Sequence, residues 1–329
     1  MRTAPVAVAI VTHDSAADLP ECLAAVARLD PAPAELAIAD CASHDASVEI
    51  ARRCLPPEIA SRLLELGENR GFAGGTNAAI AATASPWILT LNPDAFPASD
   101  FLARLLEVAS DPRAGRVGAV AGRLIRPGSP STLDACGMRL VRSWRHLDRG
   151  SGEPDSGQYA LPERVFGATG AASLWARAAL DDVAVDGEVL DQRFHSYRED
   201  AELCFRLRER EWEILYAPAA RCLHRRRVTP VGRRQVPAEI NRRSLQNRYL
   251  LRAGHQSAGN LLATLPFTLA RDLAAFAWVV AAERTSLPAY GWLWRHRREI
   301  FERRRRLRAR RTAAPGAVER WFGRDGEPL

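Results

Sequence analysis

Apolar residues in the first hundred positions form two kinds of run, short continuous stretches and stretches with a spacing of three or four. The continuous β-rich run from Val6 to Val11 ends at Thr12, as expected of a buried parallel strand followed by a loop. Residues 19–29 have apolar positions at helical spacing, and the turn over residues 30–33 ends that pattern. The chain therefore begins with a strand and a helix.

The same alternation continues to about residue 125. It predicts strands over 35–39, 63–66, 87–91 and 117–124 and helices over 46–54, 71–84 and 101–109. Strands that alternate with helices form a parallel sheet covered by helices, and ligands bind such a sheet at the carboxyl ends of its strands. The sequence therefore predicts an α/β fold with a mostly parallel sheet.

The pattern changes after residue 125. Residues 126–162 are rich in Pro, Gly and Ser, which predicts mobile loops. Sheet character returns over 166–174 and 214–217, with a helix predicted over 199–210, and residues 238–311 indicate a helical appendage. We expect two parts, an α/β domain over 1–236 and a helical, Arg-rich region over 237–329.

The apolar segment over 261–282 suggests a membrane span, but Pro266, Arg271 and Asp272 interrupt it. We therefore expect no stretch of the roughly 18 to 20 apolar residues that a span requires. Two alternatives remain, an amphipathic helix that lies on a bilayer and an ordinary helical hairpin packed on the domain. The aromatic residues available to the first alternative are Trp278, Trp292 and Trp294.

Charge is distributed unevenly along the chain. Residues 1–219 hold 22 Arg and 31 acidic residues, a net charge of −9, whereas residues 220–329 hold 24 Arg and 8 acidic residues, a net charge of +16. The absence of Lys is typical of a codon bias toward GC-rich DNA. The basic tail indicates an anionic partner, either phospholipid head groups or nucleic acid.

The six cysteines form no CxxC pair and no zinc-like spacing, which is typical of reduced thiols. Residues 1–5 run directly into the first strand without a positively charged leader, so we expect a cytoplasmic protein.

Several polar residues stand where the predicted strands end. Asp94 follows the strand over 87–91 within an Asn-Pro-Asp turn, where its carboxylate can hold a divalent cation that neutralises a diphosphate. Asn-Pro-Asp is also an ordinary turn sequence. Asp40 ends the strand over 35–39 and either reaches a ligand or caps its own loop.

Glycines precede the helix predicted over 71–84. Gly71, Gly74 and Gly75 allow a positive φ and close backbone approach, so backbone N–H groups there can face an anion. A tight turn needed only for packing explains the same residues.

Two further clusters carry chemistry. Glu199 and Asp200 begin a predicted helix, so one can face a cleft while the other caps the helix, or both can complement the helix dipole. His224 follows the strand predicted over 214–217. Its imidazole suits Mn²⁺ better than Mg²⁺, although a lone His is commonly structural. Arg225, Arg226 and Arg227 either clamp a diphosphate or form a solvated charged run.

Five motifs together resemble family 2 glycosyltransferases, most strongly the bacterial rhamnosyltransferase-like branch, over about residues 5–226. They occur in the order seen in that family. They are the strand end at Thr12, Ala39-Asp40-Cys41-Ala42-Ser43-His44-Asp45, Glu68-Asn69-Arg70-Gly71-Phe72-Ala73-Gly74-Gly75-Thr76-Asn77, Leu91-Asn92-Pro93-Asp94 and Tyr197-Arg198-Glu199-Asp200-Ala201-Glu202-Leu203.

This resemblance implies a GT-A-type fold and an inverting transfer of a sugar from a nucleotide donor to a hydroxyl. It implies that Asp200 is the base, with Glu199 as a supporting carboxylate, and that Asp94 and His224 bind Mg²⁺ or Mn²⁺. The residues implied in nucleotide-sugar binding are Thr12, Asp40, Asn69, Gly71, Gly74, Asn77, Asn92 and Asp94. This chain has Asn92 where the family often has Asp, and Glu211 where a Gly commonly precedes an aromatic residue.

The combined prediction is an inverting glycosyltransferase that uses dTDP-rhamnose and a polyprenyl-linked or other membrane-bound glycan of the cell envelope. Its basic tail would hold it at the inner face of the membrane. A nucleotidyltransferase is an alternative, but Thr12-His13-Asp14-Ser15 stands where that class has a Gly-rich loop with a basic residue. A nucleic-acid-binding protein is another, but no aromatic-interleaved basic surface or zinc pattern is present. We therefore expect no nucleic-acid partner.

Overall fold

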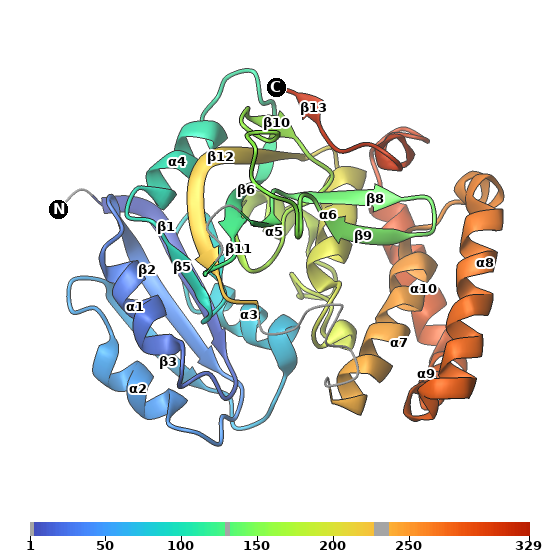
Figure 1. Cartoon of the computed structure of the whole chain (residues 1–329), viewed down its shortest axis with the longest axis horizontal. Coiled ribbons are helices and arrows are strands. Elements are labelled where there is room, and N and C mark those ends of the chain that lie inside the picture. Colours follow the sequence, from blue (N-terminus) through green and yellow to red (C-terminus); the bar gives the residue numbers. More distant parts are fainter. Residues whose placement is uncertain (1–2, 129–131, 227–236) are drawn as a thin grey trace.

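A computed structural model describes residues 3–128, 132–226 and 237–329 of the chain. Its centre is an 11-stranded sheet with helices on both faces and a group of helices at one end (Figure 1). The α/β fold with a helical C-terminal region, expected from the alternation of runs, is confirmed. Arg227, a candidate for holding a diphosphate, lies outside the described residues.

The sheet is mostly parallel, as predicted. Strands β3, β2, β1 and β4 are parallel neighbours, β11 runs antiparallel between β4 and β6, and β12 is parallel to β6. The order is β13-β10-β12-β6-β11-β4-β1-β2-β3, with β5 on β12 and β7 on β6. The bounds are β1 Thr3–Thr12, β2 Ala32–Asp40, β3 Ala60–Glu65, β4 Trp87–Leu91, β5 Ala95–Pro97, β6 Val117–Ile125, β7 Leu133–Ala135, β10 Glu163–Arg164, β11 Ala172–Ala176, β12 Glu213–His224 and β13 Glu327–Pro328.

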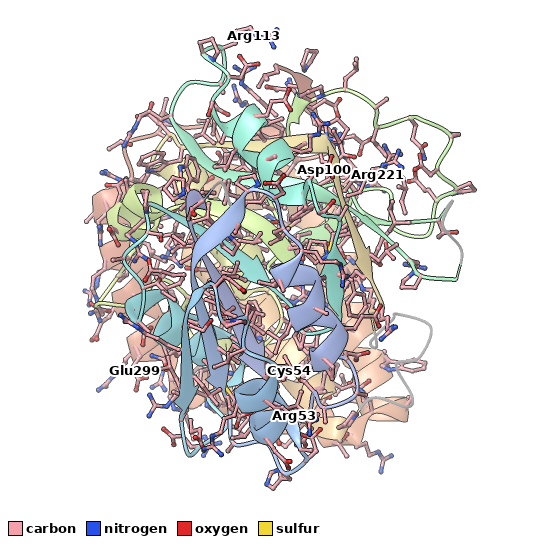
Figure 2. All side chains as sticks on the ribbon, turned by 90° about the vertical axis from the view of Figure 1, so that its left-hand side faces the viewer. Arg53, Cys54, Asp100, Arg113, Arg221 and Glu299 are labelled. Atoms are coloured by element: carbon pink, nitrogen blue, oxygen red, sulfur yellow. The ribbon has the colours of Figure 1, made fainter. Side chains whose placement is uncertain are left out.

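Alternate residues of β1 supply two separate cores. Val6, Val8 and Ile10 pack with α1, α2 and α4, whereas Ala7 and Ala9 face the core that contains α3, α5 and α6. Burial on both faces explains why this strand is apolar throughout. Figure 2 shows the helices of the first face in front of the sheet. The helix bounds are α1 Leu19–Ala27, α2 Ser47–Cys54, α3 Gly71–Ala81, α4 Phe101–Ala109, α5 Arg177–Val183 and α6 Glu199–Glu209.

The region 126–162 differs from the prediction of loops. Besides β7 it contains an antiparallel hairpin of β8 (Met138–Val141) and β9 (Arg145–Asp148). Strands of three or four residues among Pro and Gly are too short to leave a readable alternation. Strand β12 also continues beyond the predicted range of 214–217. His224 was expected to come after this strand, but it is the last residue of the strand.

The C-terminal region is helical, as predicted, and consists of α7 (Ala238–His255), α8 (Ala258–Ala282), α9 (Pro288–Arg295) and α10 (Arg297–Arg310). It is tied to the sheet domain by buried polar contacts. The indole N–H of Trp144 donates to Oδ1 of Asn260 at 2.6 Å, and His255 lies 3.1 Å from Glu209 and 3.5 Å from Glu202.

Helix α8 corrects the expectation that no apolar stretch is long enough to span a membrane. Pro266 lies inside an unbroken helix of 25 residues. The helix reaches a mean hydropathy of 1.4 over its most apolar window and meets the requirements of length and composition for a span. Only 11% of that window is buried, and α8 lies at the outer edge of the molecule (Figure 1).

Candidate active site

Two neighbouring cavities lie at the carboxyl ends of the central strands. One has a volume of about 740 Å³ and is lined by residues that follow β1, β2 and β4 and by the start of α7. The other, of about 340 Å³, lies toward the start of α6 and the β8–β9 hairpin. Asn92, Asp94 and Tyr197 line both. A reaction between two substrates fits this arrangement because each substrate can occupy one cavity and meet the other at Asp94.

Thr12 and Asp40 are the last residues of β1 and β2, and they line neither cavity. The Thr12 hydroxyl donates to Oδ1 of Asp40 at 2.9 Å, and the Ser43 N–H donates to its Oδ2 at 2.9 Å. Asp40 is only 3% exposed. Its carboxylate thus orders the loop that follows β2, while Cys41 and His13 line the larger cavity itself.

The start of α3 lines the larger cavity through Asn69 and Gly71. Gly71 has φ +65°, and a Cβ there would lie 2.4 Å from Nδ1 of His195. The backbone N–H of Gly71 donates to Oδ1 of Asn69 at 2.9 Å. The positive φ is confirmed at Gly71 and was wrong for Gly74 and Gly75, which lie inside α3 and do not have a positive φ.

Gly74 and Asn77 do not line either cavity. A Cβ on Gly74 would lie 3.0 Å from Oε1 of Gln192. The Asn77 amide donates to the Leu190 carbonyl and accepts from the Leu190 N–H, both at 2.8 Å. Both residues therefore hold the segment before α6 against α3, and their role in donor binding stays a prediction.

Asp94 is brought to the cavity by the turn after β4. The Ala95 N–H donates to the Asn92 carbonyl at 3.0 Å, and the Arg225 N–H donates to the Asp94 carbonyl at 2.9 Å. Oδ1 of Asp94 lies 3.3 Å from Nε2 of His224, whose Nδ1 lies 2.8 Å from Oδ2 of Asp134. The three side chains form a buried chain of acid, imidazole and acid.

Electrostatics hold this chain in its charged form. Burial alone would lower the pKa of His224, but its hydrogen bonds to Asp134 and Asp94 raise it to about 9. Burial would raise the pKa of Asp134, but the hydrogen bond to His224 and the charge of Arg226 lower it to about 2. Asp134 therefore fixes the orientation of the imidazole toward Asp94.

Asp94 and His224 fit a divalent metal as a pair of donors once His224 gives up the proton that the two carboxylates stabilise, because an imidazole nitrogen must be unprotonated to bind a metal. A carboxylate oxygen and an imidazole nitrogen suit Mn²⁺, and Mg²⁺ accepts the carboxylate. The carboxylate of Asp134 on the far nitrogen of His224 is the outer support that metal-ligating histidines commonly have. Among the described residues no group of three or more Asp, Glu, His or Cys is placed to hold a metal, so the substrate diphosphate and water would have to supply the remaining ligands.

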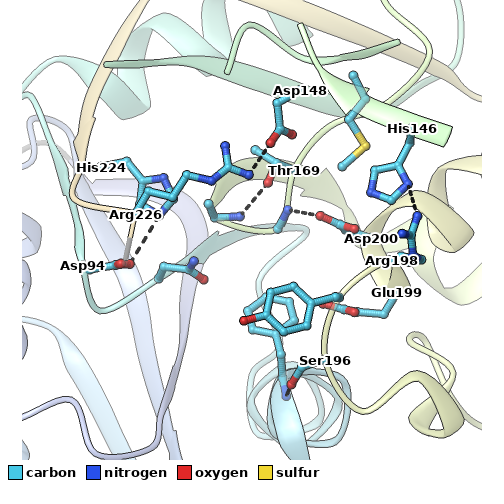
Figure 3. Close-up of a pocket in the computed structure, with 16 residues that line it drawn as sticks. Asp94, His146, Asp148, Thr169, Ser196, Arg198, Glu199, Asp200, His224 and Arg226 are labelled. Carbon is cyan, nitrogen blue, oxygen red and sulfur yellow. Dashed lines mark hydrogen bonds and ion pairs between the residues drawn. The ribbon is translucent and has the colours of Figure 1, made fainter. Parts of the chain in front are cut away.

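Glu199 and Asp200 begin α6 and line the smaller cavity (Figure 3). Oδ2 of Asp200 accepts from the Gly170 N–H at 3.1 Å and Oδ1 accepts from the Ala201 N–H at 2.7 Å. Burial raises the pKa of Asp200 to about 6, although these N–H groups oppose the rise. A carboxylate with that pKa is well suited to accept a proton near neutral pH.

Glu199 is more deeply buried and is 4% exposed. Its Oε2 has no hydrogen-bond partner among the described residues. Burial, followed by the charge of Asp200, raises the pKa of Glu199 well above its usual value. Both causes disfavour a second negative charge beside Asp200.

The sequence missed several residues of the smaller cavity. His146 and Asp148 come from the β8–β9 hairpin, and Asp148 accepts from Nη2 of Arg226 at 2.5 Å. Arg226 also donates to Asp134 at 3.1 Å. Arg225 instead pairs with Asp18 and Glu21. Since the hairpin was expected to be a loop, no pattern in the sequence pointed to His146 or Asp148.

The segment that leads into α6 has an unusual backbone. His195, Tyr197 and Arg198 have φ values of 59°, 71° and 77°, a region that non-glycine residues rarely occupy. The Asn247 side-chain amide, on α7, donates to the carbonyls of this segment, at 2.7 Å to Phe194, 2.9 Å to Ser196 and 2.8 Å to Tyr197. The C-terminal region thus holds the segment that positions Asp200.

Comparisons with known proteins agree with this geometry. The model of a family described as "Glycosyl transferase family 2" matches residues 7–151. An N-acetylglucosaminyl-diphospho-decaprenol L-rhamnosyltransferase of Mycobacterium tuberculosis is 28% identical over 240 residues, which are 66% of this chain and 75% of that protein.

Solved structures share the fold at low identity. A mannosyltransferase from Pyrobaculum calidifontis, in complex with GDP-Man and Mn²⁺, has a TM-score of 0.55 and 20% identity, covering 93% of this chain and 85% of its own. S. aureus TarS in complex with UDP-GlcNAc has a TM-score of 0.52 and 13% identity, covering 98% of this chain and 89% of its own.

Proposed function

Because this chain is a glycosyltransferase of family 2, we propose that it transfers rhamnose from dTDP-rhamnose to a hydroxyl of a polyprenyl-diphosphate-linked glycan, with inversion at the anomeric carbon. The observation that carries this proposal is the pair of cavities that meet at Asp94, with Asp200 lining the smaller one. The donor occupies the larger cavity and the acceptor hydroxyl the smaller.

Asp200 acts as the general base. Its ionised carboxylate takes the proton of the acceptor hydroxyl as the acceptor oxygen forms a bond to the anomeric carbon. The bond between that carbon and the diphosphate oxygen breaks, and its electron pair leaves with the nucleoside diphosphate. The Gly170 N–H, 3.1 Å from Oδ2 of Asp200, fixes the orientation of the base, and the raised pKa of Glu199 disfavours a second negative charge beside it.

In this proposal Asp94 and His224 would hold a divalent metal. A metal bound there neutralises the charge that develops on the departing diphosphate. Asn92, which lines both cavities, contributes an amide where the resemblance to family 2 implies a carboxylate, so the protein would supply one negative charge fewer to the metal. The contacts of Thr12, Asp40, Asn69 and Gly71 support roles in shaping the donor cavity around the nucleotide.

The acceptor assignment rests on the mycobacterial relative, whose name specifies a decaprenyl-linked acceptor. A lipid-linked acceptor requires an active site at a membrane surface, which agrees with the net charge of +16 over residues 220–329. We propose that the protein works at the cytoplasmic face of the membrane, with residues 1–236 as the GT-A domain and residues 237–329 as the part nearest the lipid.

A panel of nucleotide sugars tests the proposal, with release of nucleoside diphosphate measured in Mn²⁺ or Mg²⁺ and a polyprenyl-linked acceptor present. We expect dTDP-rhamnose to be the best donor. Asp200→Asn should lower kcat by about 10²- to 10⁴-fold because the base is removed, and Asp94→Ala should lower metal-dependent turnover comparably.

Asp100→Ala is the matched control, because this acid stands just before α4 (Figure 2), pairs with Arg104 and lines neither cavity. Its turnover should equal that of the parent. The site assignment is wrong if Asp94→Ala and Asp200→Asn also turn over at the parental rate. The donor assignment is wrong if another nucleotide sugar is preferred, and the transferase assignment fails if none is turned over.

A further inference from the structure

Helix α8 turns its polar side toward the protein. Asn260, Thr264 and Thr268 are 6%, 3% and 1% exposed, and they repeat every four residues along one side of the helix. Asp272 continues the same side and forms ion pairs with Arg248 and Arg252 of α7. Contacts within the protein therefore satisfy the polar side of α8.

The apolar side of α8 faces outward. Its members follow one another at a spacing of three or four residues and are 41% to 75% exposed, and they are Leu262, Leu265, Leu269, Leu273, Phe276 and Val280. A surface helix of a water-soluble protein has the opposite arrangement, with the apolar stripe toward the core. A contiguous exposed stripe of this kind marks an interaction surface. We call it the α8 apolar stripe.

A groove of about 590 Å³ lies beside this stripe, between α7, α8, α9 and α10. Its walls are apolar and include Tyr249, Leu293 and Phe301, and Leu261 joins it to the stripe. Four arginines also line it, and no carboxylate does among the described residues, so the groove has the lining of a site for an anion with an apolar body. The arginines are Arg252, Arg297, Arg304 and Arg308.

Most of the positive charge in the groove has no carboxylate partner within residues 3–128, 132–226 and 237–329. Of the four arginines, Arg252 alone pairs with a carboxylate of this part of the chain, Asp272 at 2.5 Å. Arg304 donates to neutral carbonyls, including that of Gln256 at 2.6 Å, and burial, then the charge of Arg308, lowers its pKa. Arg297 stacks on Trp294 at 4.3 Å. An anion in the groove would relieve this mutual repulsion.

We propose that the α7–α10 face docks on a lipid bilayer, with the α8 apolar stripe in the interfacial layer and the phosphate of an anionic phospholipid in the arginine groove. Charge complementarity and the continuity of stripe and groove select this occupant. Trp278 and Trp294, 45% and 69% exposed, have the amphipathic rings that favour the membrane interface. The proposal deepens the membrane location in the proposed function and rests on it.

The structure favours docking over spanning. A helix that crosses the bilayer must satisfy its polar side chains within the hydrocarbon layer. The partners of Asp272 are two arginines on α7, a helix that contacts the active-site segment through Asn247. Helix α8 would therefore have to leave α7 to insert, and the ion pairs of Asp272 with both arginines would be lost.

The test measures co-sedimentation of the full chain with vesicles of phosphatidylcholine alone and of phosphatidylcholine mixed with phosphatidylglycerol. We expect tight binding to the mixed vesicles. Arg297→Gln with Arg308→Gln should weaken that binding by roughly 20- to 30-fold, about fivefold for each charge at a membrane surface. Leu269→Ser with Leu273→Ser should abolish binding without unfolding the protein, because both side chains are already exposed.

A charge-matched control is Arg52→Gln with Arg53→Gln on α2, which lies at the opposite end of the molecule from α8 (Figure 1). It should bind vesicles as the parent does. The proposal is overturned if the groove variant binds like this control, if phosphatidylcholine alone is bound equally well, or if alkaline carbonate cannot release the protein. It is also overturned if the parent chain does not bind vesicles and the Leu269→Ser with Leu273→Ser variant instead loses a dimer or loses retention on nucleic acid.

Transfer to a short-chain, water-soluble acceptor analogue separates this inference from the proposed function. The stripe variant should keep parental turnover with that analogue. If the parent binds mixed vesicles but turns over no nucleotide sugar, the proposed function fails while docking stands. If turnover is normal and vesicle binding is absent, docking fails alone.

Discussion

The most informative single substitution is Asn247→Leu on α7. The Asn247 amide group donates toward three carbonyls of the segment before α6, those of Phe194, Ser196 and Tyr197. Leucine has a similar volume and no donor, so the change removes the hydrogen bonds and largely keeps the packing. It therefore tests whether these bonds position the general base.

The magnitude follows from the number of donors. An amide group has two hydrogens, so two full hydrogen bonds are lost, each contributing about 1 kcal/mol, and buried carbonyls lose their partners at a further cost. We expect the free energy of unfolding to fall by about 2 to 4 kcal/mol. The left-handed backbone at His195, Tyr197 and Arg198 costs about 1 to 2 kcal/mol per residue, so the freed segment should relax toward ordinary φ values.

Relaxation of this segment moves Asp200, which begins the next helix. A misplacement of about 1 Å at a reacting group can lower the rate by about 10²-fold, so we expect kcat to fall by about 10- to 100-fold. The assay measures kcat with dTDP-rhamnose and acceptor at a temperature where urea titration finds the variant folded.

Asn260→Leu is the matched control. Asn260 is a buried amide in the same helical region, and it accepts from Trp144 rather than contacting the segment before α6. It should lose stability and keep the parental kcat. An Asn247→Leu variant that loses stability but also keeps the parental kcat would refute the positioning role.

Four further predictions follow from the backbone and the base. Glu211 has φ +63°, so Glu211→Gly should raise the free energy of unfolding in urea by about 1 kcal/mol. Gly187→Ala, at φ +81° in open space, should lower it by a similar amount. Gly71→Ala should lower the free energy of unfolding more than Gly67→Ala does, by about 1 to 3 kcal/mol. Both glycines have a positive φ, but a Cβ on Gly71 would lie 2.4 Å from His195, whereas one on Gly67 would meet no neighbour. Equal losses of stability would contradict this contact. Since the Asp200 pKa is about 6 and only the ionised carboxylate accepts a proton, kcat/KM should rise with pH and reach half its plateau near pH 6. A profile flat across that region would exclude Asp200 as the base.

The sequence predicted the strand-end part of the site well. Asp94 and Asp200 were expected to share a cleft, and both line the smaller cavity. For Asp94 the reason is geometric, because the carboxyl ends of neighbouring parallel strands converge at one edge and a strand end can be recognised from its apolar run. Asp200 begins α6 and follows no strand, so its prediction depended on the resemblance to family 2. His224 reached the same cavity for a different reason, since β12 extends to it.

The support of the site was not predictable from local patterns. Asp134 contacts His224 across 90 positions of sequence, and Asp148 reaches Arg226 across 78. Both acids come from the segment whose Pro and Gly content predicted loops. For Asn77 the local pattern suggested a role in donor binding that its contacts do not support. It stands in a motif implied to bind the donor, but its side-chain nitrogen and oxygen both bind the backbone of Leu190.

The division of the chain near residue 236 has a consequence for experiments. Truncation there would be expected from the sequence to remove a membrane-binding appendage and leave the catalyst intact. In the structure, α7 carries both Asn247, which holds the segment before Asp200, and Arg248 and Arg252, which hold α8 through Asp272. One helix thus connects the lipid-facing stripe to the base, and truncation would remove both together. Point substitutions keep α7 in place. Those in the α8 apolar stripe change the membrane-docking surface, and Asn247→Leu changes the support of the general base, so together they separate membrane docking from proton transfer.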